Sequence, residues 1–371
     1  YKFKDTLGRG LKILNEEINN TSKSIFNGET AFRLYDTYGF PLDLTQDILK
    51  SKNINVDMNS FNKLMELQKQ RAKKSWVGSG SKKNEDFWFD IIDKTIATEF
   101  IGYNTLKGAG VIQIIISNNN IIKKLSKNKE GYIITNQTPF YGESGGQVGD
   151  KGVIVNNSSK FIVENTEKIF DKIHLHYGKV FEGEFNTEDQ VFLEVDSKIR
   201  RSITLNHSAT HLLHAALREV LGNHVTQKGS LVESKRLRFD FSHNKPILNS
   251  QIAIVEKLSK DIINQDEKVY VEFMTQEKAI NSGAMALFGE KYSDEVRVIT
   301  MGKKKSSFFS KELCGGTHVH KTSDIINVKI INQSSVASGI GRIEAIMGEK
   351  IDQYLKQQEL EELESNKEII E

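Results

Sequence analysis

Apolar residues near the start of the chain recur at three- and four-residue steps, as in Leu7, Leu11, Leu14 and Ile18. This spacing places their side chains on one face of a helix. We predict three further helices, over about 29–38, 43–51 and 60–76, the first of them ended by Gly39 and Pro41. A Gly/Ser-rich stretch at 77–81, followed by charged residues to 86, predicts a linker.

From Phe87 to about Val195 the pattern changes to short β-branched runs separated by Gly, Asn and Asp. The runs are 111–116, 132–135, 160–163, 172–177 and 190–195. Short strands at this spacing predict a small barrel or sandwich. The segment 137–147 is too rich in glycine for the interior of a strand. We expect a loop there, whose backbone closely approaches another group.

From about Ile199 to Met347 the pattern mixes helical and strand periods. Helices are predicted near 206–221 and 250–264, and strands near 237–241, 269–274 and 296–300. Beyond Met347 the residues are rich in Glu, Lys and Leu, which predicts a helix running to Glu371.

The predicted fold class is therefore α+β multidomain: a helical segment, a small β-barrel and an α+β core. The expected boundaries are 1–86, 87–198, 199–347 and 348–371. A length of 371 residues agrees with two or three domains, at about 100–200 residues each. The chain begins at Tyr1 without a Met, so we expect a piece of a longer protein.

Composition narrows the class of protein. Lys and Arg number 51 against 49 Asp and Glu, so any nucleic-acid contact must come from local charge. No apolar run approaches the ~20 residues that span a bilayer, so a membrane partner is not expected. Cys314 is the only cysteine, which excludes an intramolecular disulfide and fits a reducing cytoplasm.

Candidate metal ligands occur in two pairs, each four residues apart. His207 and His211 share one face of a predicted helix, and Cys314 and His318 flank two glycines that permit a tight turn. Three imidazoles and a thiolate form a ligand set suited to Zn²⁺. Either pair alone is better explained as ordinary core or surface residues than as metal ligands, and this is the interpretation we give His214. The presence of the only cysteine in the second pair favours a joint site.

Two zinc chemistries are excluded by spacing. A zincin peptidase needs Glu directly after the first histidine, where this chain has Ser208. A nucleobase deaminase needs H-x-E and P-C-x-x-C, and the sequence contains neither.

The chain resembles the editing domain of bacterial alanyl-tRNA synthetases at three motifs: LNHSATH at 205–211, QKGSL at 227–231 and ELCGGTH at 312–318. The string AFRLYDTYGFP at 31–41 resembles the end of the same family's helical tRNA-recognition domain, and 283–292 and 342–345 also fit. The chain departs from the family at Gly341, usually basic there, and in a small insertion at 303–309.

The resemblance implies a specific activity. The family attaches alanine to tRNA(Ala) with ATP and Mg²⁺ in a class II domain, and hydrolyses wrongly attached serine or glycine in a second site. The class II motifs would lie upstream of Tyr1. A C-terminal domain that helps hold tRNA and supports dimerisation would follow Glu371. We therefore expect editing from this piece, but not aminoacylation.

Residue by residue, the resemblance implies one zinc ion per chain on His207, His211, Cys314 and His318. Gln227 falls at the editing-pocket glutamine, and Ser144 and Gln147 lie in the loop that closes the pocket. Asp36 aligns with the acidic residue that reads the acceptor stem of tRNA(Ala). Without the resemblance, Gln227 would be an ordinary strand residue and the loop with Ser144 and Gln147 a structural turn. Asp36 would be a carboxylate on a helix surface. Lys303, Lys304 and Lys305 either contact phosphates near the 3′ end or form a solvated loop.

Two roles for zinc stay open, because four protein ligands are typical of structural sites while catalytic zinc keeps a position free. Cys314 or His318 would have to yield to water in the catalytic case. Three rival functions also stay open. They are a freestanding trans-editing factor, a zinc-stabilised RNA-binding module without hydrolysis, and threonyl-tRNA synthetase editing. The first and third would lack the string that contains Asp36.

Overall fold

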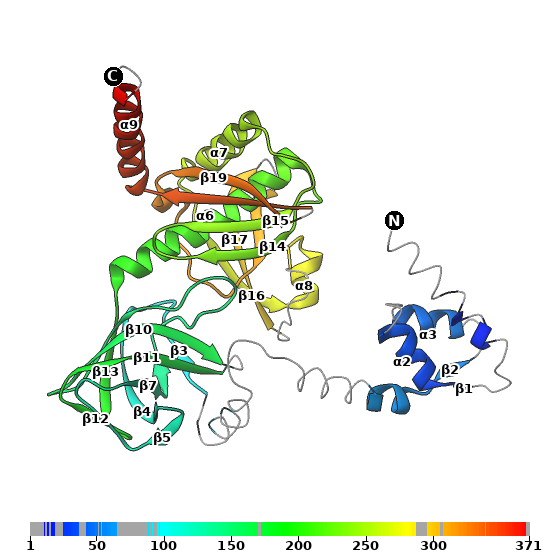
Figure 1. The fold of residues 1–371 in the computed structure, drawn as a ribbon, viewed down its shortest axis with the longest axis horizontal. Helices are drawn as coiled ribbons and strands as arrows, with labels where there is room; N and C mark the ends of the chain where they lie inside the picture. Colours follow the sequence, from blue (N-terminus) through cyan, green and yellow to red (C-terminus); the bar gives the residue numbers. More distant parts are fainter. Residues whose placement is uncertain are drawn as a thin grey trace. The chain divides into compact units, whose positions relative to one another are not determined.

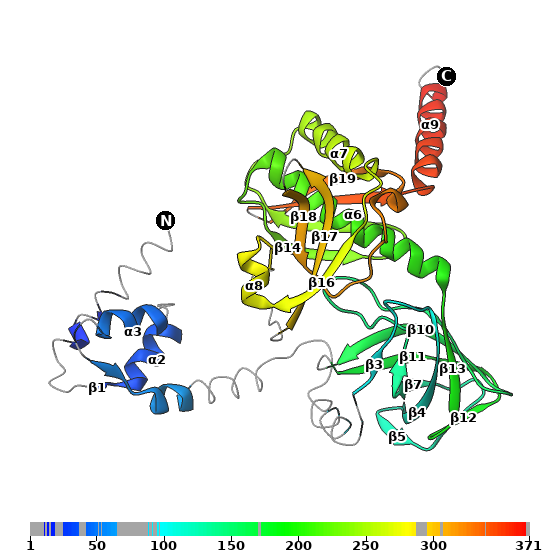
Figure 2. The same ribbon diagram turned by 180° about the vertical axis from the view of Figure 1, so that it is seen from behind.

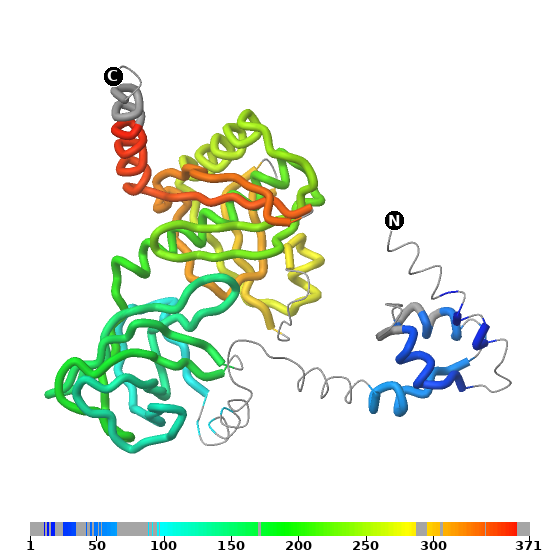
Figure 3. The backbone as a smooth tube through the Cα atoms, in the orientation of Figure 1, coloured from blue at the N-terminus to red at the C-terminus, as the bar shows by residue number. Residues whose placement is uncertain are grey.

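A computed structural model describes residues 11, 13–14, 16–18, 25–36, 42–50, 52, 54–64, 88, 91, 95, 97–169, 172–286, 295–304, 307–337 and 339–368. Figure 3 draws the others in grey. The chain divides into two compact units, Tyr1–Lys83 and Asn84–Glu371.

The first unit packs short helices around a small apolar core. Its described helical residues include α2 (Gly28–Asp36), α3 (Leu42–Lys50) and residues 58–64, as well as 11, 13–14 and 16–18. β1 (Ile25–Phe26) pairs in parallel with β2 (Asn55–Val56). The Asn27 side chain accepts from the Glu29 backbone N–H at 2.7 Å, which caps α2. The core includes Leu14, Phe26, Leu34, Leu49 and Phe61. The predicted helices near 29–38 and 43–51 are present, while 37–41 and the predicted linker at 77–86 lie outside the described residues.

The second unit begins with a closed barrel (Figure 1). Its ring consists of β4 (Lys107–Ser117), β7 (Glu130–Thr135), β11 (Ile173–Glu182), β10 (Lys160–Ile169), β9 (Gly152–Val155) and β13 (Gln190–Val195), which pairs back to β4. Alternate side chains point inward, so that Phe161, Leu193 and Ile112 are fully buried. The predicted barrel or sandwich is therefore a barrel.

Shorter strands surround this ring. β5 (Asn120–Ile122) extends the barrel sheet beside β4, β6 (Lys124–Ser126) pairs with β12 (Glu184–Asn186), and β3 (Glu99–Phe100) pairs in parallel with β8 (Gln137–Thr138). The glycine-rich segment after β8 carries positive φ at Gly145 and Gly146, of +58° and +84°, which glycine adopts without strain.

Two antiparallel sheets and a buried helix form the core of the second unit (Figure 2). One sheet has the order β14 (Gln227–Val232), β15 (Leu237–Ser242), β20 (Ile340–Met347), β19 (Val328–Ala337), and the other β16 (Tyr270–Thr275), β17 (Glu295–Lys304), β18 (Ser307–Leu313). Helix α6 (Ser197–Leu221) contributes to one apolar cluster with residues of both sheets. The remaining elements are α7 (Asn249–Ile263), α8 (Gln276–Asn281), the 3₁₀ helix η1 (Thr322–Ile325) and α9 (Lys350–Glu368).

Helix α6 starts nine residues earlier than the predicted 206. The Asp196 carboxylate accepts from the backbone N–H groups of Lys198 and Ile199, both at 3.0 Å, and so caps the helix. Its first turns are polar, so hydrophobic spacing did not reveal them. Within its 25 residues, 14 are buried, including the segment with the paired histidines.

The predicted insertion at 303–309 is not a free loop in its described part. Lys303 pairs with Phe308 and Lys304 with Ser307, which makes it the end of the β17–β18 hairpin. Within β17, Gly302 has a φ of +69°, which glycine adopts without strain. Among the helices that the structure describes, none is long and apolar enough to cross a membrane.

Candidate metal centre and adjoining pocket

Four side chains from two distant segments converge. α6 contributes His207 and His211, and the turn after β18 contributes Cys314 and His318. One ligand atom from each lies within 4.8 Å of the others, so the group can hold a metal ion. Cys314 Sγ lies 3.4 Å from His207 Nε2 and 3.3 Å from His318 Nε2.

These separations fit zinc. Tetrahedral zinc with bonds of about 2.0 Å to nitrogen and 2.3 Å to sulfur places the two ligand atoms roughly 3.5 Å apart. The observed separations are close to that value, and the donor set of three imidazoles and one thiol is one that Zn²⁺ prefers.

Each imidazole also has a polar atom close to its other nitrogen. Gln147 Oε1 lies 2.7 Å from His207 Nδ1, and Glu312 Oε2 lies 3.0 Å from His211 Nδ1. Ser208 Oγ lies 3.2 Å from His318 Nδ1. Partners on Nδ1 orient the rings and leave Nε2 for the metal, the arrangement typical of zinc sites.

The charges within the group shift the pKa values of its members. Burial alone would raise the pKa of Cys314, but His207, His318 and His211 hold it well below its usual range. Burial would lower the pKa of His211, yet the Glu312 carboxylate and the Cys314 thiolate raise it to about 10. Burial lowers the pKa of His318 to about 3. The thiolate form of Cys314 is the one that ligates a metal.

The Cys-Gly-Gly-Thr-His turn is held by two side chains from elsewhere. The Arg297 guanidinium donates to the carbonyl oxygens of Cys314 and Gly316, at 2.9 and 2.8 Å. The Tyr103 hydroxyl, from the barrel, donates to the Gly315 carbonyl at 2.5 Å, and its ring lies against Arg297. A Cβ on Gly316 would lie 1.9 Å from His207 Cε1, so only glycine permits this approach.

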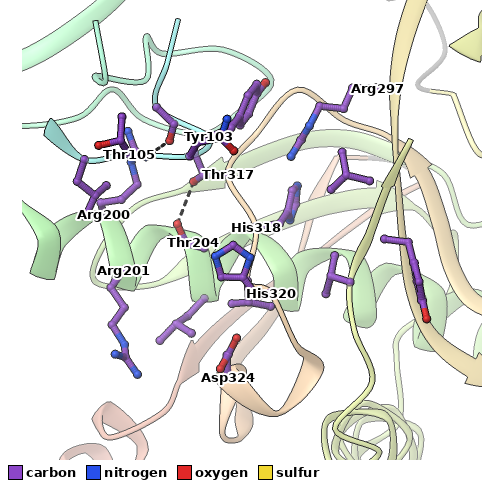
Figure 4. Close-up of a pocket in the computed structure, with 18 of the residues that line it drawn as sticks. Tyr103, Thr105, Arg200, Arg201, Thr204, Arg297, Thr317, His318, His320 and Asp324 are labelled. Carbon is purple, nitrogen blue, oxygen red and sulfur yellow. Dashed lines mark hydrogen bonds between the residues drawn. The ribbon is translucent and has the colours of Figure 1, made fainter. Parts of the chain in front are cut away.

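A cavity of about 820 Å³ adjoins the ligand group, and His318 belongs to both. Figure 4 shows Tyr103 and Arg297 on one side of it, with Arg200, Arg201 and Thr204 on α6. The hydroxyls of Thr204 and Thr317 lie 3.0 Å apart in its wall. The size is typical of a small-molecule or cofactor site.

Part of the lining of this cavity is aromatic and basic. Tyr270 and Phe273 of β16 are 43% and 61% exposed, and both line it. Arg201 and Lys268 are exposed at its edge. Exposed rings beside cations are features of sites that bind single-stranded nucleic acid.

The predicted site residues other than the four ligands lie at several places in the structure. Gln147 is fully buried beside the ligand group, and Ser144 is half-buried three residues before it. Gln227 begins β14 opposite Phe241, and its side chain makes no hydrogen bond to the four ligands. Asp36 is the last residue of α2, and Lys305 lies outside the described residues. Lys303 and Lys304 form ion pairs with Glu267 and Glu219.

The sequence pointed to Gln147 but not to the other residues around the ligands. Glu312 precedes Cys314 by two positions in the ELCGGTH motif, and Ser208 follows His207 directly, so both stood beside a recognised ligand. His214 Nδ1 lies 3.1 Å from Glu312 Oε1, outside the ligand group. Tyr103 and Arg297 lie outside the motifs that contain the four ligands, so no sequence pattern indicated them.

Comparison with known proteins gives two family matches. The model described as tRNA synthetases class II (A) matches residues 1–199, and the threonyl and alanyl tRNA synthetase second additional domain matches residues 296–344. Similar curated proteins are the alanine–tRNA ligases of Sinorhizobium medicae, Rhizobium meliloti and a Chelativorans species, which are 50%, 49% and 48% identical over 364 residues. Each match covers 96% of this chain and 41% of the relative.

Proposed function

The chain belongs to the class II alanyl-tRNA synthetase family, and we propose that this part of it hydrolyses tRNA(Ala) wrongly charged with serine or glycine. The observation that carries the proposal is the ligand group of His207, His211, Cys314 and His318, which opens through His318 onto the 820 Å³ cavity. A synthetic site shaped for alanine rejects these amino acids poorly, since one methyl or hydroxyl is worth only ~1–3 kcal/mol. A second, hydrolytic site removes the error.

The proposed occupant of the cavity is the 3′ end of the tRNA with its aminoacyl ester. Tyr270 and Phe273 offer faces on which unpaired bases stack, and Arg201 and Lys268 offer charge for phosphates. The hydroxyls of Thr204 and Thr317 offer partners for the hydroxyl of a serine. Gln227 and Ser144 are proposed from the family resemblance as further contacts to the amino acid.

When bound, zinc supplies a Lewis acid that polarises a carbonyl or lowers the pKa of water. The chain's own residues prepare for this. Glu312 keeps His211 oriented by its carboxylate, and Arg297 fixes the backbone on both sides of Gly315. Tyr103 closes the barrel side of the pocket against that same turn. A purely structural zinc would require the same supports, so hydrolysis is the property to test.

Recognition of the tRNA outside the cavity is proposed from the resemblance. Asp36 would read the acceptor stem, where a guanine amino group is the distinctive donor of the minor groove. Lys303, Lys304 and Lys305 would contact phosphates, although the first two already pair with carboxylates. The chain spans 41% of the length of its relatives. We propose that the longer protein is cytoplasmic and attaches alanine to tRNA(Ala) with ATP and Mg²⁺.

The direct test is hydrolysis of Ser-tRNA(Ala) and Gly-tRNA(Ala) by the chain, with Ala-tRNA(Ala) as the control substrate. We expect release of serine and glycine at least tenfold faster than release of alanine. No selective release, from protein that is folded and carries one zinc, would favour the zinc-stabilised RNA-binding module instead.

Cys314→Ala separates the two roles of zinc. If Cys314 yields its position during hydrolysis, the variant keeps zinc and fold but loses release of serine. If zinc only builds the pocket, the variant loses metal and unfolds at lower urea concentration. Metal content and a urea titration distinguish these outcomes.

A further inference from the structure

We propose that Gln147, from the glycine-rich loop of the barrel, is a positioning residue of the metal centre. It holds His207 in the tautomer that can bind the metal, and it thereby couples metal binding to docking of this loop. The inference rests on the metal centre of the proposed function, but not on hydrolysis.

The hydrogen bonds around Gln147 determine the tautomer. Gln147 Oε1 accepts from the Thr317 backbone N–H at 2.9 Å. A backbone N–H can only donate, so the amide atom that faces it must be the oxygen. The same oxygen lies 2.7 Å from His207 Nδ1, which must therefore carry a proton. The lone pair is left on Nε2, 3.4 Å from Cys314 Sγ.

The loop is seated closely on the core at this point. The Val232 N–H donates to the Gly146 carbonyl at 2.7 Å, and the Val148 N–H donates to the Val232 carbonyl at 3.1 Å. A Cβ on Gly146 would lie 2.7 Å from the Ser230 carbonyl oxygen, and one on Gly316 would lie 2.9 Å from Gln147 Oε1. Both glycines are therefore needed for the amide oxygen to reach His207.

Packing alone does not account for a glutamine here. Its side chain is fully buried, and its Nε2 has no hydrogen-bond partner among the described residues. An unpaired buried donor destabilises the folded chain, and an apolar side chain of similar size would avoid that cost. The oxygen is the part of the side chain that has partners, and it joins His207 to the turn that carries Cys314 and His318.

Three variants of the full chain test the role: Gln147→Leu, Gln147→Glu and, as a matched control, Gln190→Leu at an exposed position of the barrel strand β13. Zinc affinity is measured by competition with a chromogenic chelator, and cobalt spectra report the ligand geometry. We expect Gln147→Leu to bind zinc 10- to 100-fold more weakly, with altered cobalt bands. Gln147→Glu retains an acceptor and should stay within about threefold of wild type, as should Gln190→Leu.

Wild-type affinity in Gln147→Leu would overturn the proposal. Equal losses in the Leu and Glu variants would also overturn it, because they would show that only amide packing matters. If the wild type binds zinc but does not release serine, the proposed function fails while this inference stands.

Hydrogen exchange of the wild type tests the coupling between metal binding and loop docking, even if Gln147→Leu does not fold. On zinc binding we expect the amides of Val148, Val232 and Thr317 to exchange at least tenfold more slowly. The amides of β5, across the barrel, serve as an internal control and should not change. Protection confined to α6 and the turn at 314–318 would contradict the coupling.

Discussion

His174 and His176 lie two residues apart on β11, whereas His207 and His211 lie four apart on α6, and all four are buried. In the barrel, His176 contacts the Ile133 carbonyl and the Thr138 hydroxyl, both at 2.8 Å, and His174 stacks on Phe100. Burial lowers the pKa of His174 to about 3 and that of His176 to about 4. The pKa of His211 is instead about 10, because Glu312 and Cys314 outweigh its burial.

The difference lies in what surrounds each ring. Around His207 and His211, the oxygens of Gln147 and Glu312 lie within 3.0 Å of Nδ1, and the Cys314 thiol belongs to the same ligand group. No group within the described part of the barrel supplies His174 and His176 with such a thiol. Sequence spacing and burial alone therefore do not mark a candidate metal site; the Cys314 thiol and the third histidine, His318, beside the pair on α6 do.

The largest expected effect is on stability, at the contacts of Arg200 that join α6 to the barrel. Arg200 is buried and donates to Asp150 and to the carbonyls of Gly102 and Pro139. Arg200→Met leaves the Asp150 carboxylate buried without its partner, so we expect the free energy of unfolding to fall by about 3–5 kcal/mol. Urea denaturation measures this, and Arg201→Met at an exposed neighbouring position is the control. A loss below about 1 kcal/mol would show that the joint does not depend on this ion pair.

The next largest effect is on zinc affinity, which should depend on the histidine pair of α6 but not on that of β11. His211→Asn removes one of four ligands, and we expect zinc affinity to fall at least about a hundredfold. His174→Leu should leave it unchanged, because that ring lies outside the ligand group. Chelator competition measures both. Loss of zinc in the His174 variant would mean that the barrel pair contributes to the site.

The pairs should also respond differently to acid. Burial gives His174 and His176 folded-state pKa values below the usual 6.5, so the unfolded chain binds more protons. Their contribution to the free energy of unfolding is complete above pH 6.5. It is lost as the pH falls toward about 4, by ~1.4 kcal/mol per pH unit for each histidine. Urea midpoints between pH 7 and 4 should fall less steeply in His174→Leu. Identical slopes would contradict the assigned cause.

A smaller effect tests the pocket beside the cluster. Thr204→Val removes one hydroxyl of the Thr204–Thr317 pair while keeping its shape. One hydrogen bond is worth ~1 kcal/mol, so release of serine should slow about fivefold and release of glycine should change little. Equal slowing of both would assign Thr204 to packing.

The smallest effect is expected at the β17–β18 hairpin. Lys303 and Lys304 already pair with carboxylates, so replacing Lys303, Lys304 and Lys305 by Ala should reduce the salt dependence of tRNA binding by less than one unit of slope per lysine. The slope is measured from 50 to 200 mM salt. An unchanged slope would remove the proposed phosphate contact.

Local signals predicted the elements and the ligands, and long-range contacts completed the site. Helical spacing brought His207 and His211 together, and the only cysteine marked the second pair. Gln147 reaches His207 from 60 positions away and Tyr103 reaches Gly315 from 212, distances over which no periodicity acts. The start of α6 depended on the Asp196 cap rather than on an apolar stripe. Gln227 was assigned to the pocket from the family resemblance alone, and its place at the start of β14 opposite Phe241 does not test that assignment.

The central claim is that one metal ion, on His207, His211, Cys314 and His318, supports hydrolysis of mischarged tRNA. It is tested most directly by titrating metal-free protein with zinc while recording serine release from Ser-tRNA(Ala). The account predicts that release rises in proportion to added zinc and stops rising at one equivalent per chain. Release that is undiminished without zinc, or absent at one bound equivalent, would contradict it.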